Sequence, residues 1–212
     1  MLLTRWSQKF YQTTRGRIVA LLRRASLTVD QIASALGLTD NAVRAHLTSL
    51  ERDGLVEQHV ARRGGVGKPA HVYQLSADAD PLFSQAYIPI LTQLLDILAE
   101  RMPPEELERV MQAVGRRMAA GQMLPPAELE DRVKRAAALL DSLGGVTEVE
   151  SRDGALAIRG FSCPLGAAVQ RHPEVCTAVE TLLSDVIGVP VHEQCDRGER
   201  PRCCFLVDGR AE

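Results

Sequence analysis

The sequence predicts an α+β protein with an N-terminal winged helix-turn-helix, central helices and a small C-terminal α/β domain rich in cysteine. Three features of the chain lead to this prediction. In the first third, amphipathic helices joined at a glycine precede a basic, glycine-rich hairpin. A mainly apolar helical stretch follows. The last third alternates β-rich runs with helical segments and contains all five cysteines, Cys163, Cys176, Cys195, Cys203 and Cys204.

Changes in composition along the chain place the boundaries of these parts. Residues 1–76 should form the winged helix-turn-helix, residues 77–101 a linker and dimerisation helix, and residues 102–212 a cysteine-rich sensor domain. The chain has 212 residues, 45% of them hydrophobic, which suffices for one large core or two small ones. It has no run of eighteen apolar residues and no signal-peptide core after Met1. We therefore expect a cytoplasmic protein without a membrane partner.

The charge of the chain is divided unevenly. Residues 1–75 contain eleven lysines and arginines against five acidic residues, a net charge of +6. Residues 76–212 contain fourteen against twenty-two, a net charge of −8. A basic part joined to an acidic part indicates that only the first part meets a polyanion. Charge alone is equally consistent with chance clustering on solvated faces.

Three helices are expected in the first third of the chain, at residues 14–25, 29–36 and 40–52. Thr28 and Thr39 are suited to cap the second and third of these helices, and Gly37 supplies the positive φ that a sharp turn between them needs. β-rich runs at residues 55–60 and 71–75 enclose a glycine-rich basic loop and predict a hairpin.

The rest of the chain predicts further helices and two more hairpins. A helix over residues 82–101, bent or restarted at Pro89, is the expected linker and dimer helix, with apolar residues Leu91, Leu94, Leu95 and Leu98. Two helices should begin near the proline pairs at residues 103–104 and 125–126. The tail then predicts helices at residues 165–170 and 173–187, and hairpins at residues 146–159 and 189–207.

The second and third predicted helices fit a helix-turn-helix. The small Ala33 lets the helices approach, Gly37 makes the turn, and Val43 packs back into the core. The third helix would enter the major groove of DNA with an exposed side that presents Thr39, Asp40, Asn41, Arg44, Ala45 and Thr48. Arg44 can contact a guanine edge through two nitrogens, and Asn41 an adenine edge.

The basic hairpin loop would act as the wing. Its residues Arg62, Arg63 and Lys68 would contact phosphates or the minor groove. The expected partner is a double-stranded DNA operator, and no small-molecule substrate is expected. The alternative is a small helical domain that binds another protein and leaves Arg44 solvated. Helix lengths, turn and wing agree with one another, and this agreement favours DNA.

The clustering of the cysteines indicates metal or redox chemistry. Thiols stay reduced in the cytoplasm, so clustered cysteines there are more often ligands or redox groups than structural disulfides. Thiolates suit zinc or an iron–sulfur cluster. Zinc sites usually contain pairs such as Cys-x2-Cys, whereas the gaps here are twelve, eighteen and seven residues, which favours a cluster. Each cysteine could instead be a buried apolar thiol.

Two other residue types near the cysteines are candidates for this chemistry. His172 and His192 could bind a metal, but we expect both at the surface. The arginines beside the last cysteines would stabilise thiolates and offset the charge of a cluster, unless they belong to a solvated loop. They are Arg197, Arg200 and Arg202.

The sequence around the cysteines resembles SufR-type iron–sulfur repressors, which are winged-helix proteins that control operons for building iron–sulfur clusters. The matching motifs are Phe161-Ser162-Cys163-Pro164, Pro173-Glu174-Val175-Cys176, Glu180-x-Leu182-Leu183, Gly188-Val189-Pro190-Val191, Cys195-x-x-Gly198 and Cys203-x-Phe205. The resemblance extends from Arg15 to Val207. It implies a 4Fe–4S cluster, a homodimer, and a cluster-loaded form that binds DNA as a repressor.

Five cysteines exceed the four ligand positions of such a cluster. Cys203 matches the Cys-x-Phe motif, and Cys204 falls on the other side of an extended strand. We therefore assign the ligands as Cys163, Cys176, Cys195 and Cys203, with Cys204 as the alternate to Cys203. A site of three cysteines with one exchangeable position is a further possibility.

Two rival functions follow from the same residues. The nearest is a winged-helix regulator with a structural zinc ion or a thiol–disulfide switch in place of the cluster. The other is a cysteine-dependent enzyme, but no Cys-His-Asp spacing supports it. The expected protein is therefore a regulator and not an enzyme.

Overall fold

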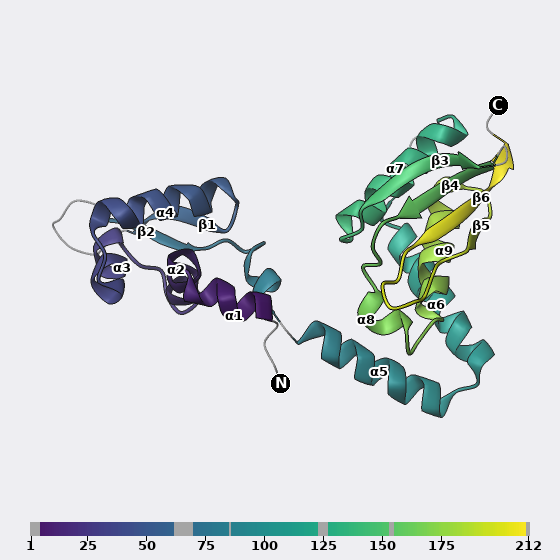
Figure 1. The fold of residues 1–212 in the computed structure, drawn as a ribbon, viewed down its shortest axis with the longest axis horizontal. Coiled ribbons are helices and arrows are strands. Elements are labelled where there is room, and N and C mark those ends of the chain that lie inside the picture. Colours follow the sequence, from purple (N-terminus) through teal and green to yellow (C-terminus); the bar gives the residue numbers. More distant parts are fainter. Residues whose placement is uncertain (1–4, 62–69, 85, 123–126, 153–154, 211–212) are drawn as a thin grey trace. The chain divides into compact units, whose positions relative to one another are not determined.

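The computed structural model describes residues 5–61, 70–84, 86–122, 127–152 and 155–210, and the chain divides into two compact units, Met1–Tyr87 and Ile88–Glu212 (Figure 1). The predicted α+β class and the N-terminal winged helix-turn-helix are confirmed. None of the described helices combines the length and apolar character that a membrane span requires.

The first unit contains a short helical bundle and one hairpin. Its elements are α1 (Arg5–Gln12), α2 (Thr14–Leu22), α3 (Val29–Leu36), α4 (Asp40–Arg52), β1 (Val56–Ala61), β2 (Ala70–Leu75) and the 3-10 helix η1 (Asp80–Phe83). Strands β1 and β2 pair antiparallel in continuous register. Leu27 pairs with Tyr73, so the segment before α3 extends the hairpin by one bridge.

The helix-turn-helix forms from local signals in the sequence. Thr28 caps α3 in a capping box with Gln31, and Thr39 caps α4. Gly37 ends α3 with φ +67°, the left-handed conformation that favours glycine. One core of apolar side chains joins the helices to the hairpin, and its most buried members are Ile18, Val19, Ile32, Val43, Leu47 and Leu50.

Helix α1 was not among the predicted elements. Phe10 packs against the core of the first unit, and its ring stacks on Phe83 with centroids 5.7 Å apart. Tyr11 meets Phe10 edge to face. These aromatic contacts join α1 to η1, which is more than seventy residues away in the sequence, so no local pattern indicated them.

The second unit is a four-stranded antiparallel sheet with helices packed on it. Its elements are α5 (Tyr87–Arg101), α6 (Pro104–Ala119), α7 (Leu129–Ser142), β3 (Thr147–Arg152), β4 (Ala155–Gly160), α8 (Gly166–Val169), α9 (Val175–Ile187), β5 (Val191–Glu193) and β6 (Cys204–Arg210). The strand order is β3-β4-β6-β5. Both C-terminal hairpins are therefore present, and the pairing of β4 with β6 joins them into one sheet.

Helices α7 and α9 pack against the sheet and form its main core. The fully buried residues there include Val133, Leu183, Ile158, Phe205 and Val207. Helix α6 packs closely on α9 because Gly115 has no side chain: a Cβ atom there would lie 2.3 Å from the carbonyl oxygen of Ala178. This close contact fixes α9, whose first turn contains Cys176.

Helix α5 packs on the second unit through one face only. The predicted helix over residues 82–101 is interrupted, because η1 ends at Phe83 and α5 starts at Tyr87 with Pro89 in its first turn, where proline is tolerated. Leu95 is buried against α6, α8 and α9, with Leu98 packed beside it. The opposite face exposes 45–69% of each apolar residue along it, namely Tyr87, Ile90, Leu94 and Ile97.

Candidate DNA-binding surface and cysteine site

Helix α4 presents the six predicted DNA-binding residues to solvent. Thr39, Asp40, Asn41, Arg44, Ala45 and Thr48 are all exposed, while Val43, Leu47 and Leu50 on the other side of the helix are buried. The Thr39 hydroxyl accepts a hydrogen bond from the Ala42 amide at 3.3 Å, so this side chain caps the helix. His46 is half-buried. Arg44 and Asn41 remain the exposed side chains best suited to contact base edges.

An ion pair that sequence reasoning missed holds the far end of α4. Arg15 on α2 contacts Asp53 at 2.5 Å and donates to the Ser49 hydroxyl at 2.9 Å. The hydrogen bond from Arg15 is the main reason why the pKa of Asp53 lies below its usual value. The pair holds α4 against α2. Its two residues are 38 positions apart in the sequence and become neighbours only in the folded chain.

The wing is described in part. Strands β1 and β2 form the predicted hairpin, and their register ends at the pair Ala61 and Ala70. The predicted wing residues Arg62, Arg63 and Lys68 lie outside the described residues. Their contacts with DNA stay a prediction.

Four of the five cysteines come together in the second unit. Cys163 follows β4, Cys176 lies in the first turn of α9, Cys195 follows β5, and Cys203 directly precedes β6. Their thiols form a row in which Cys195 contacts Cys176 and Cys203, and Cys203 in turn contacts Cys163. Four separate segments of the fold therefore place a cysteine thiol at one site.

The hydrogen bonds along this row order the thiols by acidity. The Cys203 thiol donates to Cys163, and this bond lowers the pKa of Cys163 while it raises that of Cys203 to about 12. The pKa of Cys176 is raised by its hydrogen bond to Cys195 and by burial. The interaction with Cys176 lowers the pKa of Cys195, but the interactions with Cys203 and Glu193 and the burial of the thiol outweigh it. Cys163 is therefore the thiol of this row that ionises first.

Cys204 contributes its backbone and not its thiol to the row. Its amide donates to the Cys195 sulfur at 3.2 Å, and its carbonyl accepts from the same thiol at 3.6 Å. Alternation along β6 buries Phe205 on the helix-covered face, so Cys204 points to the other face. There it lines an open polar groove together with Arg159 and Arg202.

An apolar cavity of about 350 Å³ adjoins the cysteine row. Cys163, Cys176 and Cys203 line it, whereas Cys195 and Cys204 do not. The remaining wall is almost entirely hydrocarbon, contributed by α5, α6, α9 and β6, and includes Leu91, Leu95, Met111, Val114, Met118 and Phe205. A group bound to the three thiols would therefore lie against a largely apolar wall.

Sequence reasoning also missed a carboxylate beside the thiols. The Glu193 carboxylate accepts from the Cys195 amide at 2.6 Å and pairs with the Arg197 guanidinium. Within the described part of the chain, one group that could hold a metal ion brings ligand atoms within 4.8 Å of one another, those of Cys176, Glu193 and Cys195. The Glu-x-Cys spacing before Cys195 was the available signal, but acidic residues are too common for it to stand out.

The two histidines have other partners. His192 is exposed and pairs with Asp208 at 3.0 Å. The expectation that His172 lies at the surface was wrong: its ring is buried, with 4% of the residue exposed. Asp96 and Glu174 bind both of its nitrogens, and this pairing compensates for the loss of water. Arg197, Arg200 and Arg202 are all exposed, and Arg197 pairs with Glu193 beside the row.

Comparison with known proteins identifies the first unit. Residues 12–58 match the family model described as bacterial regulatory protein, arsR family. This segment of the first unit, from the end of α1 into β1, is therefore similar to the DNA-binding region of ArsR-family regulators. The match ends before β2 and does not reach the cysteines. No curated protein matches the chain.

Solved structures that resemble the chain are distant from it. A mutant of ZitR from Lactococcus lactis is 21% identical with a TM-score of 0.31, over 46% of this chain and 66% of that one. The adhesin competence repressor AdcR from Streptococcus pyogenes is 23% identical with a TM-score of 0.31, over 46% and 71%. A MepR mutant from S. aureus, solved bound to an oligodeoxyribonucleotide, is 20% identical with a TM-score of 0.32, over 55% and 87%.

Proposed function

We propose that the chain is a DNA-binding transcriptional repressor of iron–sulfur biogenesis genes, controlled by a 4Fe–4S cluster. The proposed ligands are Cys163, Cys176, Cys195 and Cys203. The observation that carries this proposal is the convergence of four thiols beside an apolar cavity, in a chain that also contains a segment similar to ArsR-family regulators. The cysteine motifs that resemble SufR-type repressors support the same reading.

The residues at the site fit an iron–sulfur cluster. Thiolates are the usual ligands of such clusters, and the apolar wall beside the thiols would cover one side of a bound cluster. When bound, the cluster supplies a redox-active and oxygen-sensitive group. The chain's own residues bind it, shield it and offset its charge, the last through Arg197 beside Cys176 and Cys195. Cys163, with its lowered pKa, would be the first thiol of the row to ionise and bind iron.

A single zinc ion is the second candidate, and the Cys176, Glu193 and Cys195 group favours it. Zinc–sulfur bonds of about 2.3 Å require ligand atoms within about 4.6 Å of one another. Cys163 and Cys203 lie outside that group, so one ion there would leave two converging thiols unused. A cluster distributes its ligands over several iron atoms and can use all four, and we prefer it for this reason.

The proposed assembly is a homodimer formed through α5. Tyr87, Ile90, Leu94 and Ile97 recur every three or four residues along one side of this helix, as in the seam of a coiled coil. A second copy presents the same row of side chains, so the surface is self-complementary in its apolar character. Two α4 helices in one assembly would read two half-sites of a double-stranded operator.

The test of this function compares DNA binding by one preparation with and without its cluster. The DNA is a site recovered by selection from a random pool with the anaerobic protein. We expect the cluster-loaded protein to bind this site about 5–150-fold more tightly than the stripped protein, the usual range for coupled sites. Equal affinities of the two forms would remove cluster control while leaving a DNA-binding protein.

A further inference from the structure

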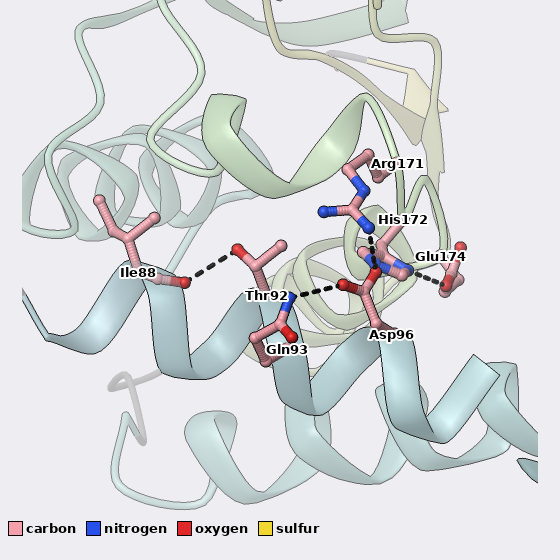
Figure 2. A network of polar contacts seen from close by, with 7 residues as sticks. All are labelled: Ile88, Thr92, Gln93, Asp96, Arg171, His172 and Glu174. Carbon is pink, nitrogen blue, oxygen red and sulfur yellow. Dashed lines mark hydrogen bonds and ion pairs between the residues drawn. The ribbon is translucent and has the colours of Figure 1, made fainter. Parts of the chain in front are cut away.

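Helix α5 is tied to the turn between α8 and α9 by a network of charged side chains (Figure 2). Asp96 on α5 accepts from the Arg171 guanidinium at 2.7 Å and lies 2.8 Å from His172 Nε2. Gln93, one turn earlier on α5, donates to the second oxygen of Asp96 at 3.0 Å. Asp96 therefore meets three donors, two of which come from a segment more than seventy residues away in the sequence.

His172 forms the buried centre of this network. Its Nε2 faces Asp96, and its Nδ1 lies 3.2 Å from a Glu174 carboxylate oxygen. Both nitrogens can donate together only when the ring is the charged imidazolium. The side chains of His172 and Asp96 are 6% and 18% exposed, so solvent screens their pairing far less than it would on the surface. Removal of one partner would leave the other buried without compensation.

The segment that Asp96 holds lies between two of the proposed ligands. Cys163 is three residues before α8, and Cys176 follows His172 by four residues in the first turn of α9. Helix α5 also meets the thiols directly across the apolar cavity, whose wall includes Leu91 and Leu95 together with Cys163 and Cys176. A polar network and a cavity wall thus connect the same helix to the same site.

We propose that Asp96 is a positioning residue that couples the state of the cysteine site to α5. The inference rests on the proposed function, because it needs a group that binds and leaves the thiols. Such a group would set the position of the α8–α9 turn. Because Asp96 binds Arg171 and His172 in that turn, a shift of the turn would also shift α5. Leu95 faces the core, while the opposite face of α5 is the proposed dimer surface. A change at the thiols would therefore alter how that surface is presented.

The test compares amide hydrogen exchange of α5 in cluster-loaded and stripped full-length protein, for the wild type and Asp96→Asn. In the wild type we expect the loaded form to exchange about tenfold more slowly along α5 than the stripped form. Asp96→Asn should keep the iron content of the wild type and reduce this ratio to below about twofold, because asparagine keeps the shape but loses the charge. Glu100→Gln makes the same charge change at an exposed position of α5 and should retain the tenfold ratio.

The outcomes separate this proposal from the proposed function. An Asp96→Asn protein that keeps both its iron and the tenfold ratio overturns the coupling role, as does a wild type that binds a cluster without any change along α5. Loss of iron in Asp96→Asn also overturns it, because Asp96 would then hold the site together instead of coupling it. A wild type without iron removes the proposed function as well. If Asp96→Asn does not fold, the loaded-to-stripped exchange ratio along α5 is measured in Arg171→Gln instead. This variant removes only the exposed donor to Asp96.

Discussion

Cys203→Ser is expected to remove most of the iron from anaerobically prepared protein, whereas Cys204→Ser should leave the iron content unchanged. Cys203 contacts the Cys163 and Cys195 thiols and lines the apolar cavity. Cys204 turns its side chain to the other face of the sheet and supports Cys195 only through its backbone, which serine retains. The measurement is iron and sulfide per monomer for each variant.

The pair of variants is its own control, because adjacent residues undergo the same chemical change. The folded content of each variant is checked by circular dichroism before iron is measured. Iron loss in Cys204→Ser with retention in Cys203→Ser would show that the first residues of β6 turn the opposite face toward the site. Equal retention in both would remove Cys203 from the ligand set and leave the three-cysteine alternative.

Arg44→Ala should weaken binding to the selected DNA site by about 1–3 kcal/mol and relax the base preference at one position of each half-site. Arg44 is exposed on α4, beside the face that buries Val43 and Leu47. It carries no ion pair among those found in the described residues, so its guanidinium is available for a base edge. The measurement is affinity for the selected site and for each single-base variant of it.

Arg52→Ala is the matched control for this experiment. Arg52 is another exposed arginine of the same helix, but it lies at the far end of α4 and approaches Asp53 only at 3.7 Å. Its loss should lower affinity for all sequences alike, through the salt-dependent phosphate contribution, and leave base preference intact. An unchanged base preference in Arg44→Ala would mean that α4 does not read DNA through this residue.

The helix-turn-helix could be predicted because its signals are local. Thr28, Gly37 and Thr39 lie within a dozen residues of one another. The two threonines cap the starts of α3 and α4, and Gly37 ends α3 in a left-handed conformation. The alternation that separates Cys203 from Cys204 is also local, since it follows from the period of a strand. Such features depend on neighbours in the sequence and not on the rest of the fold.

The parts that escaped prediction depend on partners distant in sequence. His172 looked like a surface histidine because its partner Asp96 lies 76 residues earlier, on a helix whose packing face the sequence did not reveal. Arg15 and Asp53 meet across 38 residues, and α1 is held by an aromatic stack with Phe83. Glu193 ends β5 and accepts from the Cys195 amide, but its Glu-x-Cys spacing is too common in sequences to indicate this contact.

The measurement that tests the central claim most directly is the iron, sulfide and visible absorption of the wild-type protein purified without oxygen. We expect a brown protein with iron and sulfide in equal amounts, about four of each per monomer for a 4Fe–4S cluster, and a broad visible absorption band. The colour should fade on exposure to air as sulfide is lost. A colourless protein that contains zinc and no sulfide would contradict the account and assign the thiols to a structural ion.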